Sequence, residues 1–318
     1  MRTQQGIFLS LRNGGQMKPF YDKPAKTLDE QAQILLDRGL KGISKTDLMS
    51  KLSSINYYRL RGYTYPYQDN SDPDTPFFPT NCWNTIWADY VLDSRLRSFL
   101  FECISHIEIA LKTQLTLNMS LGHEPTWYTE KDYFYNENNF SSDFSELLKN
   151  WSRSKENFKE HYENDYNSAK LPPSWIIFET ATFGVMSKYY GNLDNSVNEK
   201  DLIAQHFGFP HGCSSHLKSW LQNINIIRNI CAHHSRLFSK TNIVTPSYPV
   251  ILPDKWLVLG FAQNKVYSSI CIIKRLLDYC APDFDFMGKF TSLISTATDE
   301  QKRTMGFPVG WESEPLFN

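Results

Sequence analysis

The sequence carries almost no net charge, because 33 Lys and Arg residues are balanced by 34 Asp and Glu residues. With a formal net charge of −1, the chain has no global positive field to attract a polyanion, so any contact with RNA or DNA must come from a local cluster. Hydrophobic residues make up 41% and charged residues 21% of the chain, which is an ordinary globular composition. A chain of 318 residues can bury a sizeable core in one large domain or two smaller ones.

Cysteine motifs, a signal peptide and long apolar runs are also missing. The six cysteines are scattered, with no C-x-x-C pair and no zinc-ligand spacing. This pattern predicts reduced thiols in a cytoplasmic protein, without a disulfide framework, a metal or another cofactor. No run approaches the roughly 20 apolar residues that cross a bilayer, so we expect no membrane partner.

Strand-like alternation is scarce and no internal repeat is visible, whereas apolar residues recur at helical spacing. The sequence therefore predicts an all-α helical bundle, with a small N-terminal helical subdomain over residues 1–80 and a main helical domain over 81–318. Thr27 and Glu30 form a capping-box pattern at the first helix. Residues 1–22 are expected to form a loose arm, 68–82 and 241–254 loops, and 305–311 an irregular tail. The helices are expected near residues 28–39, 44–58, 83–122, 144–151, 174–189, 201–207, 217–238 and 255–280.

The segment Tyr57–Tyr67 interleaves five tyrosines with two arginines. Aromatic rings and guanidinium planes are what single-stranded RNA stacks on, so one interpretation is an RNA contact. The alternative is a tyrosine-rich packing seam between the N-terminal helices and the main domain. The candidate RNA-binding residues here are Tyr57, Tyr58, Arg59 and Arg61.

The segment Asn225–Arg236 concentrates two Asn, two Arg and two His residues. An arginine can bind phosphate bidentately, and a histidine is the usual proton shuttle near neutral pH. Arg228 and His233, five residues apart, could supply both functions from one piece of backbone.

If residues 217–238 form one helix, the apolar residues make a single stripe. Arg228 then lies almost on this stripe, His234 at its edge, and His233 on the opposite side near Asn229. Arg228 could therefore be a buried structural arginine paired with a glutamate, and His234 a histidine at the edge of the core. The glutamates that could pair with Arg228 are Glu102, Glu108 and Glu179.

On an ideal helix the side chains of Arg228 and His233 diverge by about 140°. Both reach one substrate only if the helix is distorted or a second subunit contributes. The spacing thus predicts a composite site, and the helix faces favour His233 over His234.

The segment Arg228–Arg236, with the sequence RNICAHHSR, resembles the signature of the abortive-infection (Abi-like, AbiD/AbiF) proteins of bacteria. These belong to the wider HEPN ribonuclease superfamily, whose mark is Arg, a polar residue, a few spacers and then His. The resemblance spans nearly the whole chain. The other stretches that carry it are Lys23–Leu36, Ile55–Tyr63, His106–Glu108, Pro173–Trp175 and Met305–Pro308.

The resemblance implies a HEPN-like bundle that pairs as a homodimer and brings two Arg–His motifs into one cleft. It implies metal-independent RNA cleavage, in which a ribose 2′-OH attacks the adjacent phosphate. Arg228 would hold the phosphate, Asn229 would be the polar second residue, and His233 or His234 would transfer a proton.

The same resemblance gives Glu108 a supporting role and makes Arg236 a further RNA contact. It implies a part in phage defence or a toxin–antitoxin pair, with a neutralising protein or small RNA as partner. Two other interpretations stay open: a non-catalytic module that holds a structured RNA, and a helical adaptor in which Arg228 is only structural.

Overall fold

The computed structural model describes residues 23–80, 82–166, 171–241, 244–249, 252 and 256–318. Within these residues the chain forms α-helices and short 3-10 helices, and its β-type pairing is limited to three isolated bridges. The all-α prediction is confirmed. The predicted arm over 1–22 lies outside the described residues. The chain divides into two compact units, which join in sequence between Trp83 and Asn84.

The N-terminal unit contains α1 (Leu28–Asp37), α2 (Lys45–Ser54) and α3 (Tyr57–Thr64). The predicted capping box is present: the Glu30 N–H donates to Thr27 Oγ1 at 3.2 Å, and the Thr27 N–H donates to the Glu30 carboxylate at 2.7 Å. The single helix predicted over 44–58 is wrong. Extended backbone at Ile55 ends α2, and the Asn56 side chain then accepts the Tyr58 N–H at 2.7 Å and starts α3.

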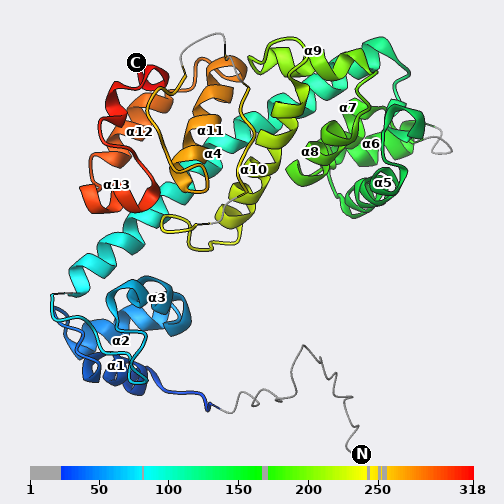
Figure 1. The fold of residues 1–318 in the computed structure, drawn as a ribbon. Helices are drawn as coiled ribbons and strands as arrows, with labels where there is room; N and C mark the ends of the chain where they lie inside the picture. The colour runs from blue at the N-terminus through cyan, green and yellow to red at the C-terminus, as the bar shows by residue number, and fades with distance from the viewer. Residues whose placement is uncertain (1–22, 81, 167–170, 242–243, 250–251, 253–255) are drawn as a thin grey trace, which may run out of the picture. The chain divides into compact units, whose positions relative to one another are not determined.

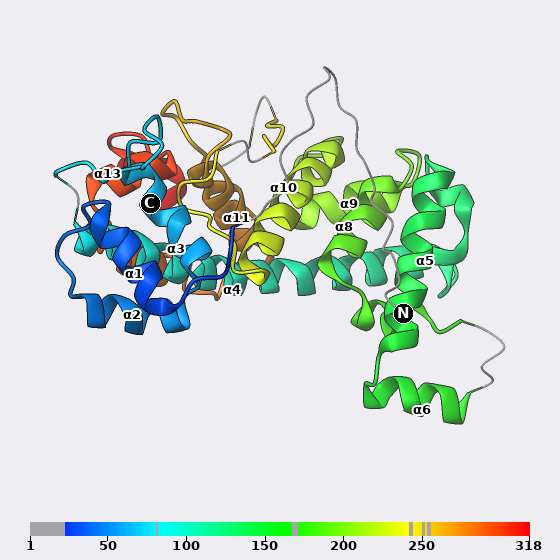
Figure 2. The ribbon, with the colours of Figure 1, turned by 90° about the horizontal axis from the view of Figure 1, so that it is seen from below.

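The C-terminal unit is built along α4 (Trp83–Gly122), a helix of 40 residues that runs beneath α10 and α11 in Figure 2. Helices α11–α13 lie toward one end of α4 and α5–α9 toward the other (Figure 1). The remaining helices are α5 (Glu137–Arg153), α6 (Asn157–Asp165), α7 (Ser174–Ile177), α8 (Phe183–Asn192), α9 (Asn198–His206), α10 (Ser214–Ala232), α11 (Val266–Cys280), α12 (Phe286–Ile294) and α13 (Asp299–Met305).

One predicted helix of this unit is split in the structure, and another begins later than predicted. The helix expected over 174–189 is split, because Ala181 is extended and Thr182 caps a new helix by accepting the Val185 N–H. The helix expected over 255–280 begins only at Val266; residues 256–265 are not helical, and Lys255 lies outside the described residues. Helices α6, α12 and α13 were not predicted, because each is shorter than three turns and too short to show a clear apolar period.

The core of this unit is assembled around α11, whose residues Val266–Leu277 are all buried. Aromatic rings from the C-terminal segment pack on it: Phe307 lies 4.7 Å from the Tyr267 ring centroid and 5.1 Å from that of Trp311. Such buried rings contribute both apolar burial and favourable edge contacts. No helix among the described residues combines the length and the hydropathy that a bilayer span needs.

Candidate active site

The segment Arg228–His234, which we call the Arg–His segment, lies at the C-terminal end of α10 and in the turn that follows it. The predicted apolar stripe is correct, because Leu217, Trp220, Ile224, Ile227 and Cys231 are all buried. The predicted length is wrong: α10 ends at Ala232, before Phe238 is reached. His233 therefore caps the helix, and His234 lies beyond it.

A Schellman-type turn ends the helix. The His234 N–H donates to the Cys231 carbonyl at 3.0 Å, and the Ser235 N–H donates to the Ile230 carbonyl at 2.9 Å. This turn requires a left-handed residue, and His234 supplies it with φ 53°. Glycine is the usual residue there, because a left-handed conformation costs other residues about 1–2 kcal/mol.

A buried carboxylate of α4 fixes the chain after this turn. Asp93 Oδ1 accepts the N–H groups of Leu237 and Phe238 at 2.9 and 2.7 Å. Asp93 has no exposed surface and also forms an ion pair with Arg97, one turn along α4. These contacts pull residues 237 and 238 onto α4, so the backbone cannot continue along the α10 axis.

The early end of α10 changes the argument about the two histidines. His233 and His234 are both exposed, so the expectation that His234 lies at the core edge is wrong. The preference for His233 rested on a helix running through both residues, and that helix stops before them. The geometry therefore leaves either histidine able to meet a substrate.

Arg228 is half-buried on α10, and its guanidinium carbon lies 5.7 Å from the ring centroid of Phe101 on α4. Its Nε is buried and has no hydrogen-bond partner among the described residues. The proposed Arg–Glu pair is wrong, because none of the three candidate glutamates forms an ion pair with Arg228. Glu102 pairs with Lys289, Glu108 pairs with Lys112 at 3.4 Å, and Glu179 is exposed.

Arg236 resembles Arg228 in its surroundings. It is half-buried, and its Nη1 is a buried donor without a partner in the described part of the chain. Asn229, one turn before His233, is exposed. The end of α10 and the turn after it thus present two incompletely paired guanidinium groups, an exposed amide and two exposed imidazoles.

The other RNA-binding candidates belong to the N-terminal unit, on α3. Tyr58 is 84% exposed and Arg59 is also exposed, while Arg61 is half-buried. Tyr57 is half-buried and its hydroxyl accepts a hydrogen bond from Arg38 at 3.1 Å. Tyr63, by contrast, is a core residue that is 2% exposed. The tyrosine-rich segment therefore contributes some side chains to the core and exposes others to solvent.

The family model described as Abi-like protein matches residues 50–239. This is more than half of the 318 residues. The chain belongs to the Abi-like family. No curated protein and no solved structure matches it. The Abi-like match ends just after the Arg–His segment and excludes two stretches that resemble the family, Lys23–Leu36 and Met305–Pro308. Membership points to a role in abortive infection, which is a form of phage defence.

Sequence reasoning missed the anchoring role of Asp93. A signal was present, because Asp89, Asp93 and Arg97 recur every fourth residue on the apolar side of the longest predicted helix. Charged residues in such positions need buried partners. Asp89 has one in Gln301 of α13, whose Nε2 donates to it at 2.8 Å. Among the described residues, no group of three or more His, Cys, Asp and Glu side chains could hold a metal ion.

Proposed function

We propose that this Abi-like protein is a cytoplasmic endoribonuclease of an abortive-infection or toxin–antitoxin system. One observation carries the proposal: Arg228 keeps a buried guanidinium N–H without a partner in the described chain, five and six residues before two histidines that are exposed at the end of the same helix. A buried donor without an acceptor costs about 1–3 kcal/mol, so its retention indicates an acceptor that arrives with a ligand. A phosphate oxygen is the acceptor that best suits a guanidinium fork.

The reaction needs no group beyond these side chains and the RNA. A ribose 2′-oxygen forms a bond to the adjacent phosphorus and loses its proton to an imidazole. The bond from phosphorus to the 5′-oxygen breaks, and that oxygen takes a proton from an imidazolium. The products are a 2′,3′-cyclic phosphate and a 5′-hydroxyl. Arg228 stabilises the charge that builds on the phosphate oxygens, and His233 or His234 moves the proton.

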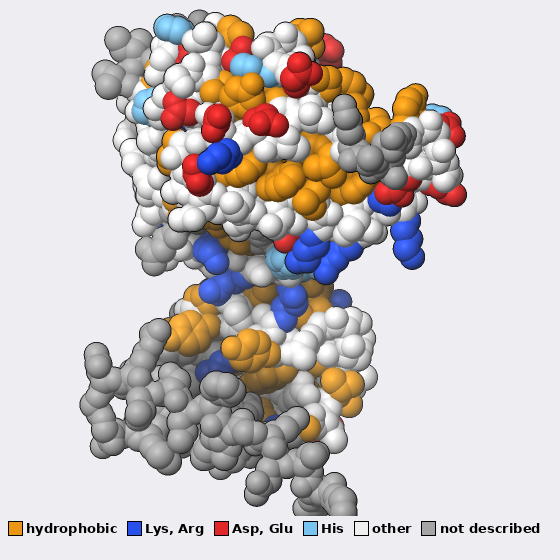
Figure 3. Space-filling view, turned by 90° about the vertical axis from the view of Figure 1, so that its right-hand side faces the viewer, with side chains coloured by type: hydrophobic (Ala, Val, Ile, Leu, Met, Phe, Trp, Pro, Cys, Tyr) orange, Lys and Arg blue, Asp and Glu red, His pale blue; other side chains and the backbone are white. Residues whose placement is uncertain are grey.

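A second copy of the chain would complete the site. Helix α4 exposes large apolar side chains at Ile109, Leu117 and Leu121, which are 64%, 49% and 81% exposed. At about 100° per residue these three side chains lie within about 120° of the helix surface. An exposed apolar face of this kind suits helix packing, so we propose a homodimer through α4. Hydrophobic side chains are plentiful on the larger unit's surface in Figure 3.

The alternative function is a non-catalytic module that holds a structured RNA, such as a small antitoxin RNA. The exposed Tyr58 and Arg59 on α3 favour RNA contact without favouring cleavage. Under this alternative, purified protein retains RNA in a salt-sensitive way and never turns it over.

The test is cleavage of RNA by the purified wild type and by Arg228→Ala, His233→Ala and His234→Ala. The matched controls are Arg153→Ala and His161→Ala, which change exposed residues of the same unit. We expect 2′,3′-cyclic phosphate ends from the wild type and the controls, and loss of cleavage in Arg228→Ala and in one histidine variant. Equal cleavage by all variants would remove the catalytic assignment, and stable binding without cleavage would establish the alternative.

A further inference from the structure

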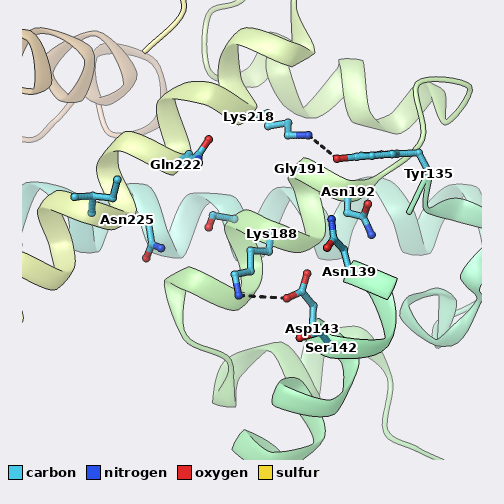
Figure 4. Close-up of a pocket in the computed structure, with 12 residues that line it drawn as sticks. Tyr135, Asn139, Ser142, Asp143, Lys188, Gly191, Asn192, Lys218, Gln222 and Asn225 are labelled. Carbon is cyan, nitrogen blue, oxygen red and sulfur yellow. Dashed lines mark hydrogen bonds and ion pairs between the residues drawn. The ribbon is translucent and has the colours of Figure 1, made fainter. Parts of the chain in front are cut away.

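A second polar site lies on α10, one turn before the Arg–His segment. It is an open pocket of about 450 Å³ lined by α5, α8 and α10 and by Tyr135 (Figure 4). This volume lies within the roughly 300–1,000 Å³ that small-molecule sites occupy. Most residues around it are polar, and four carry side-chain amides: Asn139, Asn192, Gln222 and Asn225.

Two of these amides have an acceptor without a donor. Asn192 is only 4% exposed; its Nδ2 donates to the Asn136 carbonyl at 2.9 Å, yet its Oδ1 has no partner among the described residues. The Oδ1 of Asn225 is buried and unpartnered in the same way. Buried amide oxygens in native proteins are nearly always hydrogen-bonded, so two of them lining one pocket indicate a ligand with N–H donors.

Charged and aromatic side chains complete the lining. The buried carboxylate of Asp143 lies 3.4 Å from the ammonium of Lys188, which places an acceptor beside a donor. Tyr135 is 53% exposed, and its hydroxyl accepts a hydrogen bond from Lys218 at 2.9 Å. The Lys218 ammonium lies 4.8 Å from the ring centroid and helps to hold the ring in place. An anchored, exposed aromatic ring is a surface on which a base can stack.

We propose that this pocket binds one nucleobase of the RNA, with guanine preferred. The edge of guanine offers three N–H donors, from N1 and the exocyclic amine, beside the O6 acceptor. The Asp143 carboxylate accepts from N1 and the exocyclic amine, and the neighbouring Lys188 ammonium donates to O6. Other bases have fewer N–H donors on one edge and leave more of these acceptors unpaired, which is how a built polar site discriminates.

The position of the pocket relative to Arg228 fits a single nucleotide. Asn225 precedes Arg228 by three residues and Asn229 by four, so their side chains are neighbours on α10, with Cβ atoms about 5–6 Å apart. A base in the pocket that Asn225 lines and a phosphate held by Arg228 can therefore belong to the same or adjacent nucleotides. The inference rests on the proposed ribonuclease function and adds to it a base that the enzyme selects.

The experiment measures binding separately from cleavage. Calorimetry uses the full chain carrying Arg228→Ala, with GMP, AMP, CMP or UMP as the probe, and then with uncleavable 2′-deoxy-substituted tetranucleotides that contain one guanine or none. We expect the guanine-containing probes to bind most tightly. Tyr135→Ala and Asp143→Asn should weaken that binding about tenfold, while Tyr166→Ala, which removes another exposed tyrosine of the same unit, should not.

The outcomes separate the two proposals. Guanine-dependent binding that Tyr135→Ala weakens supports the pocket even if no variant cleaves RNA. Equal binding of all four nucleotides, or binding that Asp143→Asn and Tyr135→Ala leave intact, overturns it. Binding of GMP without a preference among the tetranucleotides overturns the assignment to RNA and makes a free nucleotide the ligand.

Discussion

Arg97 and Arg228 lie on two helices that meet near the end of α10, and their surroundings differ. Arg97 is 6% exposed and pairs with Asp93, a buried carboxylate that also accepts two backbone N–H groups. Arg228 rests over Phe101 with a buried Nε that lacks a partner in the described residues. The paired arginine belongs to the structure that shapes the turn, whereas the incompletely paired one has bonding capacity left for a ligand.

Burial alone therefore does not identify a functional arginine. A guanidinium whose donors all meet protein acceptors is stabilised in place and has no capacity for substrate. One that keeps a donor without an acceptor costs stability, and such costs are concentrated at binding and catalytic sites. His234 also costs stability, because it holds a left-handed conformation that glycine would adopt more easily.

The largest expected effect is on the unfolding free energy, through the paired residues Asp93 and Arg97. Asp93→Ala leaves Arg97 as a buried charge without its carboxylate and removes the acceptor of two backbone N–H groups, so we expect a loss of about 3–5 kcal/mol of unfolding free energy. Urea denaturation followed by circular dichroism measures it, with Asp132→Ala, an exposed residue, as the control. An unchanged midpoint would show that Asp93 does not anchor the chain after α10.

The next largest effect is on RNA cleavage, through the incompletely paired Arg228. Arg228→Ala should reduce RNA cleavage about 10²- to 10³-fold, as removal of one transition-state donor does. The unfolding free energy should change by less than about 1 kcal/mol, because the substitution mainly removes the packing of the guanidinium over Phe101. Arg228→Lys should not restore cleavage, since an ammonium cannot bind phosphate as a fork. A large loss of stability in Arg228→Ala would contradict the contrast with Arg97.

The roles of the two histidines can be distinguished by one substitution, His234→Gly, which should act in opposite directions on stability and on activity. His234→Gly should raise the unfolding free energy by about 1 kcal/mol, because glycine relieves the left-handed strain. If His234 is the proton-transfer group, the same variant should lose about 10²- to 10⁴-fold in cleavage rate. If cleavage is unchanged while His233→Ala is inactive, His233 carries the proton and His234 only shapes the turn.

The smallest effect is a pH dependence of stability that comes from Cys231, a buried thiol whose pKa is influenced by Asp93 and Arg97. Burial raises the pKa of the Cys231 thiol to about 12, with the charges of Arg97 and Asp93 as lesser influences. Because the folded pKa lies above the unfolded one, this thiol's contribution to stability is complete below about pH 8.5 and is lost as the pH rises through the folded pKa. At about pH 8, just below the ordinary thiol pKa, iodoacetamide should not label Cys231 in the native protein, and should label it after unfolding. Native labelling as fast as that of half-buried Cys213 would contradict the burial.

Much of the fold could be predicted from local pattern. The apolar periodicity of α4, the capping box at Thr27 and the buried stripe of α10 each depend on residues within a few turns of one another. The splits at Ile55 and Ala181 and the late start of α11 could not be predicted in this way. At these places the helical pattern continues in sequence while backbone conformation or tertiary packing interrupts the helix.

The candidate site divides in the same way. Local sequence was enough to show that Arg228, Asn229, His233 and His234 share one short segment whose chemistry suits RNA. The end of the helix between Arg228 and the histidines depends instead on Asp93, which lies 144 residues before Leu237 and accepts its N–H group.

The pocket depends on the fold to the same degree. Asn192 and Asn225 line one cavity because α8 packs on α10, and neither residue's sequence neighbourhood indicates the other. Apolar periodicity is a property of adjacent turns, so it could be read along the chain. Hydrogen bonds and packing between distant segments leave no periodic signal, and for that reason the geometry of the site was set by the fold.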